Sequence, residues 1–318
     1  MAFNAQAQTW PNKPVKVVVP APAGSSLDVI VRGMADTLKT RWGQPLLIEN
    51  KPGAGGTIGM DLVAKAAPDG YTMIMGTLGL SLMMLAGYGG MVSLAQITVA
   101  GIAGYAVAVF GDNATGIMGF GWPWWIATPY AILIAAVTSA LIGWVSARTE
   151  GVYTIMITLA IGVAFFYLTQ QNYVLFNGFQ GFSKIGAPTV GEVDFTDPVA
   201  FYFLALGCAL AGYWAVKYLV RAPFGLALQG IRDNPRRMNS LGFNVTAHRL
   251  AAHAFAGLLA SVGGILLVWY NNRVSPGSIN TGALINILVI AVLGGMKHPI
   301  GAFVGAITFV LLQNFAID

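Results

Sequence analysis

Charged residues are scarce in this sequence. Asp, Glu, Lys and Arg make up only 9% of its 318 residues, whereas 56% are hydrophobic. A soluble domain carries about 25% charged residues, so this chain has too few to cover a water-facing surface of its size. The shortage excludes a large soluble globule and predicts an integral membrane protein.

The residues and motifs of catalytic and metal-binding sites are also missing. The single cysteine, Cys208, excludes an intramolecular disulfide framework and a cysteine-based metal site. The three histidines lack metal-ligand spacing such as H-E-x-x-H, and no G-x-x-x-x-G-K-[ST] phosphate loop or G-x-S-x-G elbow occurs. We therefore expect no catalytic residue, metal or cofactor, so any ATP hydrolysis would belong to a separate subunit.

The charges that are present lie unevenly along the chain. Twelve of the 29 fall before Tyr71, in less than a quarter of the sequence, and long apolar stretches follow. The net charge of +5 is spread over loops rather than one aromatic-lined stripe, so we expect no nucleic-acid partner. This pattern predicts a polar N-terminal piece followed by a mainly α-helical bundle in the membrane.

The polar N-terminal piece is predicted to be a small, incomplete α/β lobe over residues 15–79. Strand-like runs at 15–20 and 46–49 alternate with helical periods at 26–42 and 58–67, and residues 71–75 would form a third strand. The order β-α-β-α-β is typical of a parallel unit. Residues 1–14, with an A-x-A pattern at Ala5-Gln6-Ala7, are predicted to be a signal-peptide remnant or a disordered tail.

Two loops of this lobe place small residues between a strand and a helix. Backbone N–H groups at a helix N-terminus suit a carboxylate or phosphate, although glycine-rich turns after strands are also common without a ligand. The candidate carboxylate-binding residues are Ala23, Gly24, Ser25, Ser26, Asp28, Gly53, Gly55 and Gly56.

The stretch from Trp10 to Gly79 resembles the start of the Bug-type solute-binding proteins of tripartite tricarboxylate transporters. The resemblance rests on the runs WPNKPVKVVVPAPAGSSLDVI and GQPLLIENKPGAGGTIGMDLVAKAAPDGYTMIMGT. It implies that the loop 23–28 helps to hold a ligand carboxylate through backbone amides, and that the loop 53–56 lines the cleft. Because that family has two lobes and this stretch supplies part of one, we expect weak or no carboxylate binding.

Apolar segments dominate the rest of the chain, and we predict about eight membrane segments from their number and length. They lie at 71–88, which overlaps the third predicted strand, and at 97–110, 122–145, 152–168, 199–220, 250–269, 283–293 and 300–312. A spanning helix needs about 20 residues, so the short segments 97–110 and 283–293 are predicted to be re-entrant or buried among other helices. No charged residue lies clearly mid-span, which argues against a proton-driven carrier.

Basic residues predict the orientation of these segments. The stretch 217–249 has six basic residues and one acid, namely Lys217, Arg221, Arg232, Arg236, Arg237, Arg249 and Asp233. Since loops rich in Lys and Arg stay in the cytoplasm, this stretch is predicted to be cytoplasmic. The loop 170–198, with one lysine and three acids, is predicted to face outside. Counting back along the segments puts the N-terminal piece in the periplasm, outside a bacterial inner membrane.

The basic stretch is also predicted to contain two short helices. Residues 225–231 can form one that ends near Asn234-Pro235, and residues 236–241 can form another that stops at Gly242. A basic loop alone would be only a topology signal, but ordered helices with apolar Leu226 and Leu228 indicate a docking surface. Its candidate residues are Gly225, Leu226, Leu228, Ile231, Arg232, Asp233, Arg236, Arg237 and Gly242.

The run RAPFGLALQGIRDNPRRMNSLG, at 221–242, resembles the coupling loop of branched-chain amino-acid ABC transporter permeases. Further matches are GYGGMVSLAQ at 87–96, NGFQG at 177–181, VSPG at 274–277 and VLGGM at 292–296. The resemblance implies that residues 225–242 dock on an ABC ATP-binding subunit, and that a second homologous permease subunit and a periplasmic solute-binding protein are partners. It also implies lipid-embedded spans that line a path for hydrophobic or amide-type solutes.

The chain is thus predicted to join parts of two transport proteins near Gly79–Leu80, with a permease domain at 80–318. Compared with the permease family, the first span is expected to be replaced by the N-terminal piece, and the chain to end about one span early. Three functions compete: the permease subunit of an importer for branched-chain or related amino acids, a membrane-tethered carboxylate-binding protein, and a stand-alone carrier or channel. Whether the joined chain is a natural fusion or a non-functional chimera stays open.

Overall fold

The computed structural model describes residues 15–19, 46–50, 70–111, 119–149, 151–190 and 193–316. The chain divides into two compact units, Met1–Lys65 and Ala66–Asp318.

In the first unit, two strands pair side by side. β1 (Val15–Val19) and β2 (Leu46–Asn50) run parallel, with Val15 opposite Leu46 and Val19 opposite Asn50. Both strands coincide with the runs predicted at 15–20 and 46–49. The predicted helices and all candidate carboxylate-binding residues lie outside the described residues, so the α/β lobe stays a prediction.

The third predicted strand, at 71–75, is wrong. These residues open helix α3 (Tyr71–Met83), which continues into the π-helical turn η2 (Met84–Tyr88). The residues from Thr72 to Met83 are all buried, because α3 packs against α8, α11, α12 and α13 of the second unit. A helix satisfies its backbone groups internally, which an isolated strand inside an apolar helical bundle cannot do. The continuous apolar run 71–88 was therefore the better guide to structure.

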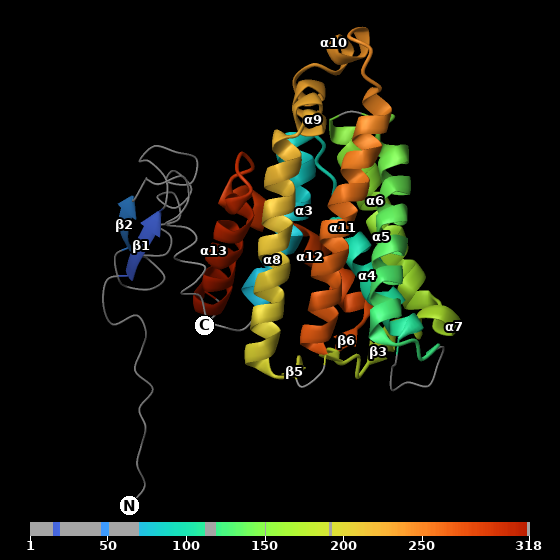
Figure 1. Cartoon of the computed structure of the whole chain (residues 1–318). Coiled ribbons are helices and arrows are strands. Elements are labelled where there is room, and N and C mark those ends of the chain that lie inside the picture. Colours follow the sequence, from blue (N-terminus) through green and yellow to red (C-terminus); the bar gives the residue numbers. More distant parts are fainter. Residues whose placement is uncertain are drawn as a thin grey trace, which may run out of the picture. The chain divides into compact units, whose positions relative to one another are not determined.

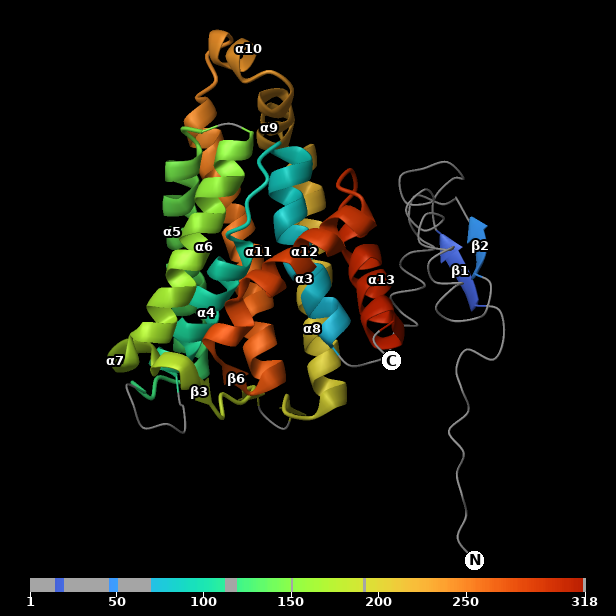
Figure 2. The same ribbon diagram turned by 180° about the vertical axis from the view of Figure 1, so that it is seen from behind.

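The second unit is a helical bundle (Figures 1 and 2). Its long helices are α4 (Gln96–Phe110), α5 (Trp124–Ser146), α6 (Val152–Gln171), α8 (Pro198–Arg221), α11 (Val245–Asn271), α12 (Thr281–Gly294) and α13 (Ile300–Ala316). Short helices are α7 (Tyr173–Phe176), η3 (Gly178–Gln180), α9 (Pro223–Asp233), α10 (Pro235–Ser240) and η4 (Pro276–Ile279). Two-residue strands β3 (Phe182–Ser183) and β6 (Arg273–Val274) pair antiparallel, as do β4 (Thr189–Val190) and β5 (Val193–Asp194).

The interior of the bundle is formed by α3, α4 and α11. Most residues of α5, α6 and α8 are exposed or half-buried, as expected for helices that face lipid. Glycines let the inner helices approach closely: a Cβ at Gly264 of α11 would overlap the backbone of Ala100 in α4. Ser139 of α5 donates a hydrogen bond of 2.7 Å to the backbone oxygen of His253 in α11.

Six helical segments of the described chain are long and apolar enough to cross a membrane, and α4 and α13 are shorter apolar helices. Together they coincide with the eight apolar segments of the sequence. Of the two short segments predicted to be re-entrant or buried, 97–110 is buried among other helices, since 13 of the 15 residues of α4 are buried, whereas 283–293 belongs to a candidate span that is only 35% buried. The chain is a multi-pass helical membrane protein, and the exact number of spans stays a prediction.

Candidate docking surface

The two short helices predicted in the basic stretch are present. α9 and α10 lie beyond the ends of α8 and α11, at one end of the bundle (Figure 1). The exposed residues there include four arginines, Arg221, Arg232, Arg236 and Arg237. Arg249 belongs to the same end, where its Nη1 donates a hydrogen bond of 3.2 Å to the backbone oxygen of Ala147, just after α5.

Prolines and an asparagine fix the bounds of these helices. The backbone of Ala222 is extended, with ψ at 160°, and Pro223 occupies the first turn of α9, where its missing N–H costs no hydrogen bond. α9 stops at Asp233 because Pro235 disfavours helical geometry in the residue before it. The side chain of Asn234 then accepts a hydrogen bond of 2.9 Å from the backbone N–H of Arg237 and caps α10.

The inner face of α9 holds the helix against the bundle. Ala227, Leu228 and Ile231 recur at helical spacing and are buried, with Leu228 and Ile231 only 0% and 1% exposed. The outer face carries Leu226, which is 62% exposed. Leu226 and Leu228 were predicted to lie on the same docking surface, whereas the structure places them on opposite faces of α9. Leu228 thus positions α9, and Leu226 is free to meet a partner.

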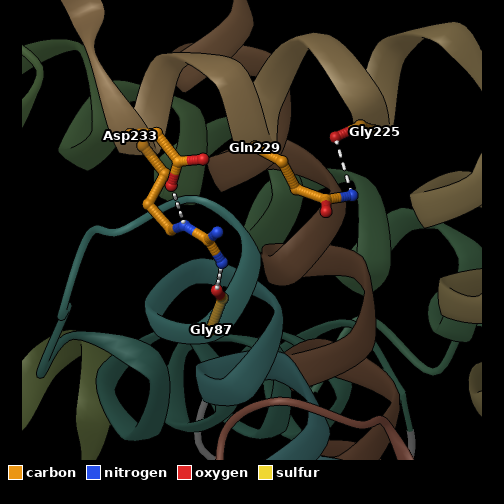
Figure 3. A network of polar contacts seen from close by, with 5 residues as sticks. Gly87, Gly225, Gln229 and Asp233 are labelled. Carbon is orange, nitrogen blue, oxygen red and sulfur yellow. Dashed lines mark hydrogen bonds and ion pairs between the residues drawn. The ribbon is translucent and has the colours of Figure 1, made fainter.

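The start of α9 lies in close contact with the end of α8, which fixes its position. A Cβ at Gly225 would overlap the backbone of Leu219 and Val220, so only glycine fits this position. Gln229 donates from Nε2 to the backbone oxygens of Val220 and Gly225, each at 3.3 Å, as Figure 3 shows for Gly225. α9 is therefore a fixed element rather than a loose loop.

Arg232, at the end of α9, reaches the neighbouring π-helical turn. Its Nη1 donates a hydrogen bond of 2.8 Å to the backbone oxygen of Gly87, and its Nε forms an ion pair of 2.9 Å with Asp233 (Figure 3). Both side chains are well exposed to solvent, so the ion pair itself adds little stability. The contact with Gly87 is the part that ties two elements together.

The tip beyond α10 is open to solvent and contains exposed residues that are absent from the predicted docking surface. An open groove of about 530 Å³ runs between α10 and the start of α11, with Arg236 and Asn239 among the residues that line it. Leu241 and Phe243 are exposed beside Gly242, whose φ of +88° ends the helical turn. The sequence signal that could have identified Leu241 and Phe243 is their position on either side of a turn glycine in a polar loop.

No group of three or more His, Cys, Asp and Glu side chains that could hold a metal ion occurs in the described part of the chain. The exposed side chains of α9 and α10 include arginines, an asparagine and a leucine. The charge of these arginines suits an acidic partner surface, and the exposed leucine suits an apolar pocket.

Comparison with known proteins identifies the second unit. Residues 70–318 match the family described as the permease component of branched-chain amino acid transport systems. The chain belongs to this permease family. Members of this family are described as permease components of transport systems rather than as enzymes, in agreement with the sequence-based prediction.

Curated relatives of the permease have different stated solutes. The high-affinity branched-chain amino acid transport system permease protein LivM of Salmonella typhimurium is 26% identical over 78% of this chain and 62% of its own length. The nucleoside ABC transporter permease protein NupC of Lactococcus lactis is 28% identical over 72% of this chain and 74% of its own length. No solved structure matches the chain.

The N-terminal part is similar to a different family. Residues 30–85 match the tripartite tricarboxylate transporter family receptor. Protein BugT of Bordetella pertussis is 39% identical over 107 residues, which cover 32% of this chain. The chain spans only 33% of BugT and 62% of LivM. The matches to the two families overlap at residues 70–85, within α3 and η2, so the permease carries a fused segment of receptor type.

Proposed function

We propose that this permease is the membrane-embedded translocation subunit of an ABC importer for branched-chain or related amino acids. A separate ATP-binding subunit docks on α9 and α10 and hydrolyses ATP. A periplasmic solute-binding protein delivers the solute, and a second homologous permease subunit completes the path. The observation that carries the proposal is a fixed, amphipathic two-helix projection at the basic end of a bundle that belongs to a permease family.

The construction of α9 supports docking over a solvated basic loop. A loop that served only as a topology signal would need neither the buried Leu228 nor the glycine contact at Gly225. Both features hold α9 in one orientation, which presents Leu226 outward. Burying such a leucine against a partner is worth about 1.5–3 kcal/mol, whereas a single exposed charge at the rim is worth about 0–1 kcal/mol.

The charge distribution supports a cytoplasmic location for this end in a bacterial inner membrane. Basic residues concentrate at the end with α9 and α10, and basic loops are retained in the cytoplasm. Counting the spans back from α9 leaves the N-terminal unit in the periplasm. For the solute, the family description and LivM favour branched-chain amino acids, and uptake of leucine against uridine separates this from the nucleoside named for NupC.

The docking surface is tested by co-purification of an ABC ATP-binding subunit co-expressed with the full chain. We expect Leu226→Asp to weaken association by about tenfold or more, because the substitution puts a charge in an apolar contact. Arg237→Ala should weaken it by at most about fivefold, because that arginine is exposed at the rim.

The matched control is Val190→Asp, which changes an exposed apolar residue of β4 at the other end of the bundle. Association should stay at the wild-type level in this variant. If Leu226→Asp retains the ATP-binding subunit as well as Val190→Asp does, the docking surface lies elsewhere.

A further inference from the structure

The end of α3 is built as a π-helical turn, η2, rather than as a simple helix end. Such turns are rare and are frequently found at functional sites. Here the chain folds back directly after the turn, where the N–H of Met91 donates a hydrogen bond of 3.0 Å to the oxygen of Leu85. The turn is packed between two other parts of the bundle, one on each side.

On one side, η2 is held by α9. The hydrogen bond from Arg232 Nη1 to the oxygen of Gly87 joins residues 145 positions apart in the sequence (Figure 3). The aliphatic part of the same arginine lies over Gly90, where an added Cβ would come within 2.5 Å of Arg232 Cγ. The φ of Gly90 is +66°, so both backbone conformation and space require glycine there.

On the other side, η2 contacts the connection between α12 and α13. The hydroxyl of Tyr88 donates a hydrogen bond of 3.0 Å to the backbone oxygen of Lys297. A Cβ at Gly87 would overlap the backbone oxygen of Met296, so the two segments touch through their main chains. The residue that accepts from Arg232 thus also packs against the α12–α13 connection.

The two helices that this connection joins, α12 and α13, form one tightly packed hairpin. A Cβ at Gly294, at the end of α12, would overlap the backbone of Gly301 in α13, and one at Gly305 would overlap the oxygen of Ile290. Backbones in such close contact cannot slide independently, so a shift of the connection moves both helices.

We propose that Arg232 is a positioning residue that transmits movement of α9 through η2 to the α12–α13 hairpin. This inference rests on the proposed docking of an ATP-binding subunit on α9. The contacts of Gly225 and Gln229 tie α9 to α8, whereas Arg232 ties it to a turn that also holds the hairpin. A partner that displaces α9 therefore displaces α12 and α13 through the Gly87 carbonyl and the Tyr88 hydroxyl.

The first test needs only the full chain in detergent, and it measures hydrogen exchange of backbone amides. We expect Arg232→Ala to speed exchange by about three- to tenfold in peptides covering 84–91 and also in those covering 295–301. Exchange at 295–301 is the informative measurement. Arg232 makes no hydrogen bond to this segment among the described contacts, so an effect there must pass through η2. Tyr88→Phe, which leaves α9 intact, should speed exchange at 295–301 by a similar factor.

Arg236→Ala is the matched control, since it removes an exposed arginine from the same projection without touching η2. It should leave both segments unchanged. Unchanged exchange at 295–301 in Arg232→Ala would overturn the inference, whether or not any ATP-binding subunit associates with the chain.

The second test adds the ATP-binding subunit. With the subunit added until it saturates each form of the chain, its association should change exchange at 295–301 in the wild type, and not in Arg232→Ala or Tyr88→Phe. Loss of co-purification in Arg232→Ala would make that arginine a docking residue and overturn the positioning role. Failure of the wild type to bind the subunit would instead refute the proposed function.

Discussion

The two ends of the bundle are built differently. At one end, α9 and α10 extend the structure with ordered helices and exposed arginines. At the other, the two-residue strands β3 to β6 and the short helices α7, η3 and η4 form the connections between long helices (Figure 2). That end carries Asp194 and Asp197, and the backbone N–H of Thr196 holds the pKa of Asp194 below its ordinary value, so this carboxyl is ionised at neutral pH.

The difference shows that charge and shape carry separate information. Charge alone predicts which side of a membrane each end faces. The buried Leu228 and the close contact of Gly225 hold α9 against the bundle, and the orientation of the chain in the membrane does not require them. In the proposed function, docking of a protein partner at the basic end accounts for that additional structure.

The largest expected difference between the ends is the side from which each can be labelled. In a Cys208→Ala background, Ser240→Cys should react with a membrane-impermeant maleimide only after the membrane is opened. Thr189→Cys, in β4, should react in intact cells, because both positions are exposed to solvent but at opposite ends. Labelling of Ser240→Cys from outside intact cells would reverse the orientation.

A pair of glycine substitutions compares the structural role of the two ends. Gly225→Ala should displace α9 and reduce association with an ATP-binding subunit by about tenfold or more, because overpacking against backbone costs about 1–3 kcal/mol. Gly181→Ala creates an equally severe overlap with the backbone of Val274, at a φ of +64°. It should disturb the β3–β6 end and leave association unchanged, as measured by co-purification. Equal losses in both variants would point to general unfolding.

Much of the bundle was predictable from sequence. Long apolar runs predicted the helices, and Asn234-Pro235 and Gly242 marked the ends of the two short ones, whereas α9 begins at Pro223, two residues before its predicted start. The error at 71–75 came from weighing five strand-like residues above the continuous run that contains them. The direction of Leu228 was also readable, since Ala227, Leu228 and Ile231 follow a helical period that Leu226 does not share.

Other features of the site have no local signature. The hydrogen bond between Arg232 and Gly87 depends on how α3 and α9 pack, and it links segments that are distant in sequence. The π-helical turn at Met84–Tyr88 has the same small and apolar residues as the α-helix before it. Such contacts arise from tertiary packing, which residue periodicity does not specify.

The most direct test of the docking surface is site-specific crosslinking in the assembled importer. A photoreactive amino acid placed at Leu226, on the exposed face of α9, should crosslink to the ATP-binding subunit, and the same probe at Val190 should not. Absence of a crosslink from Leu226, or an equal yield from Val190, would contradict the account.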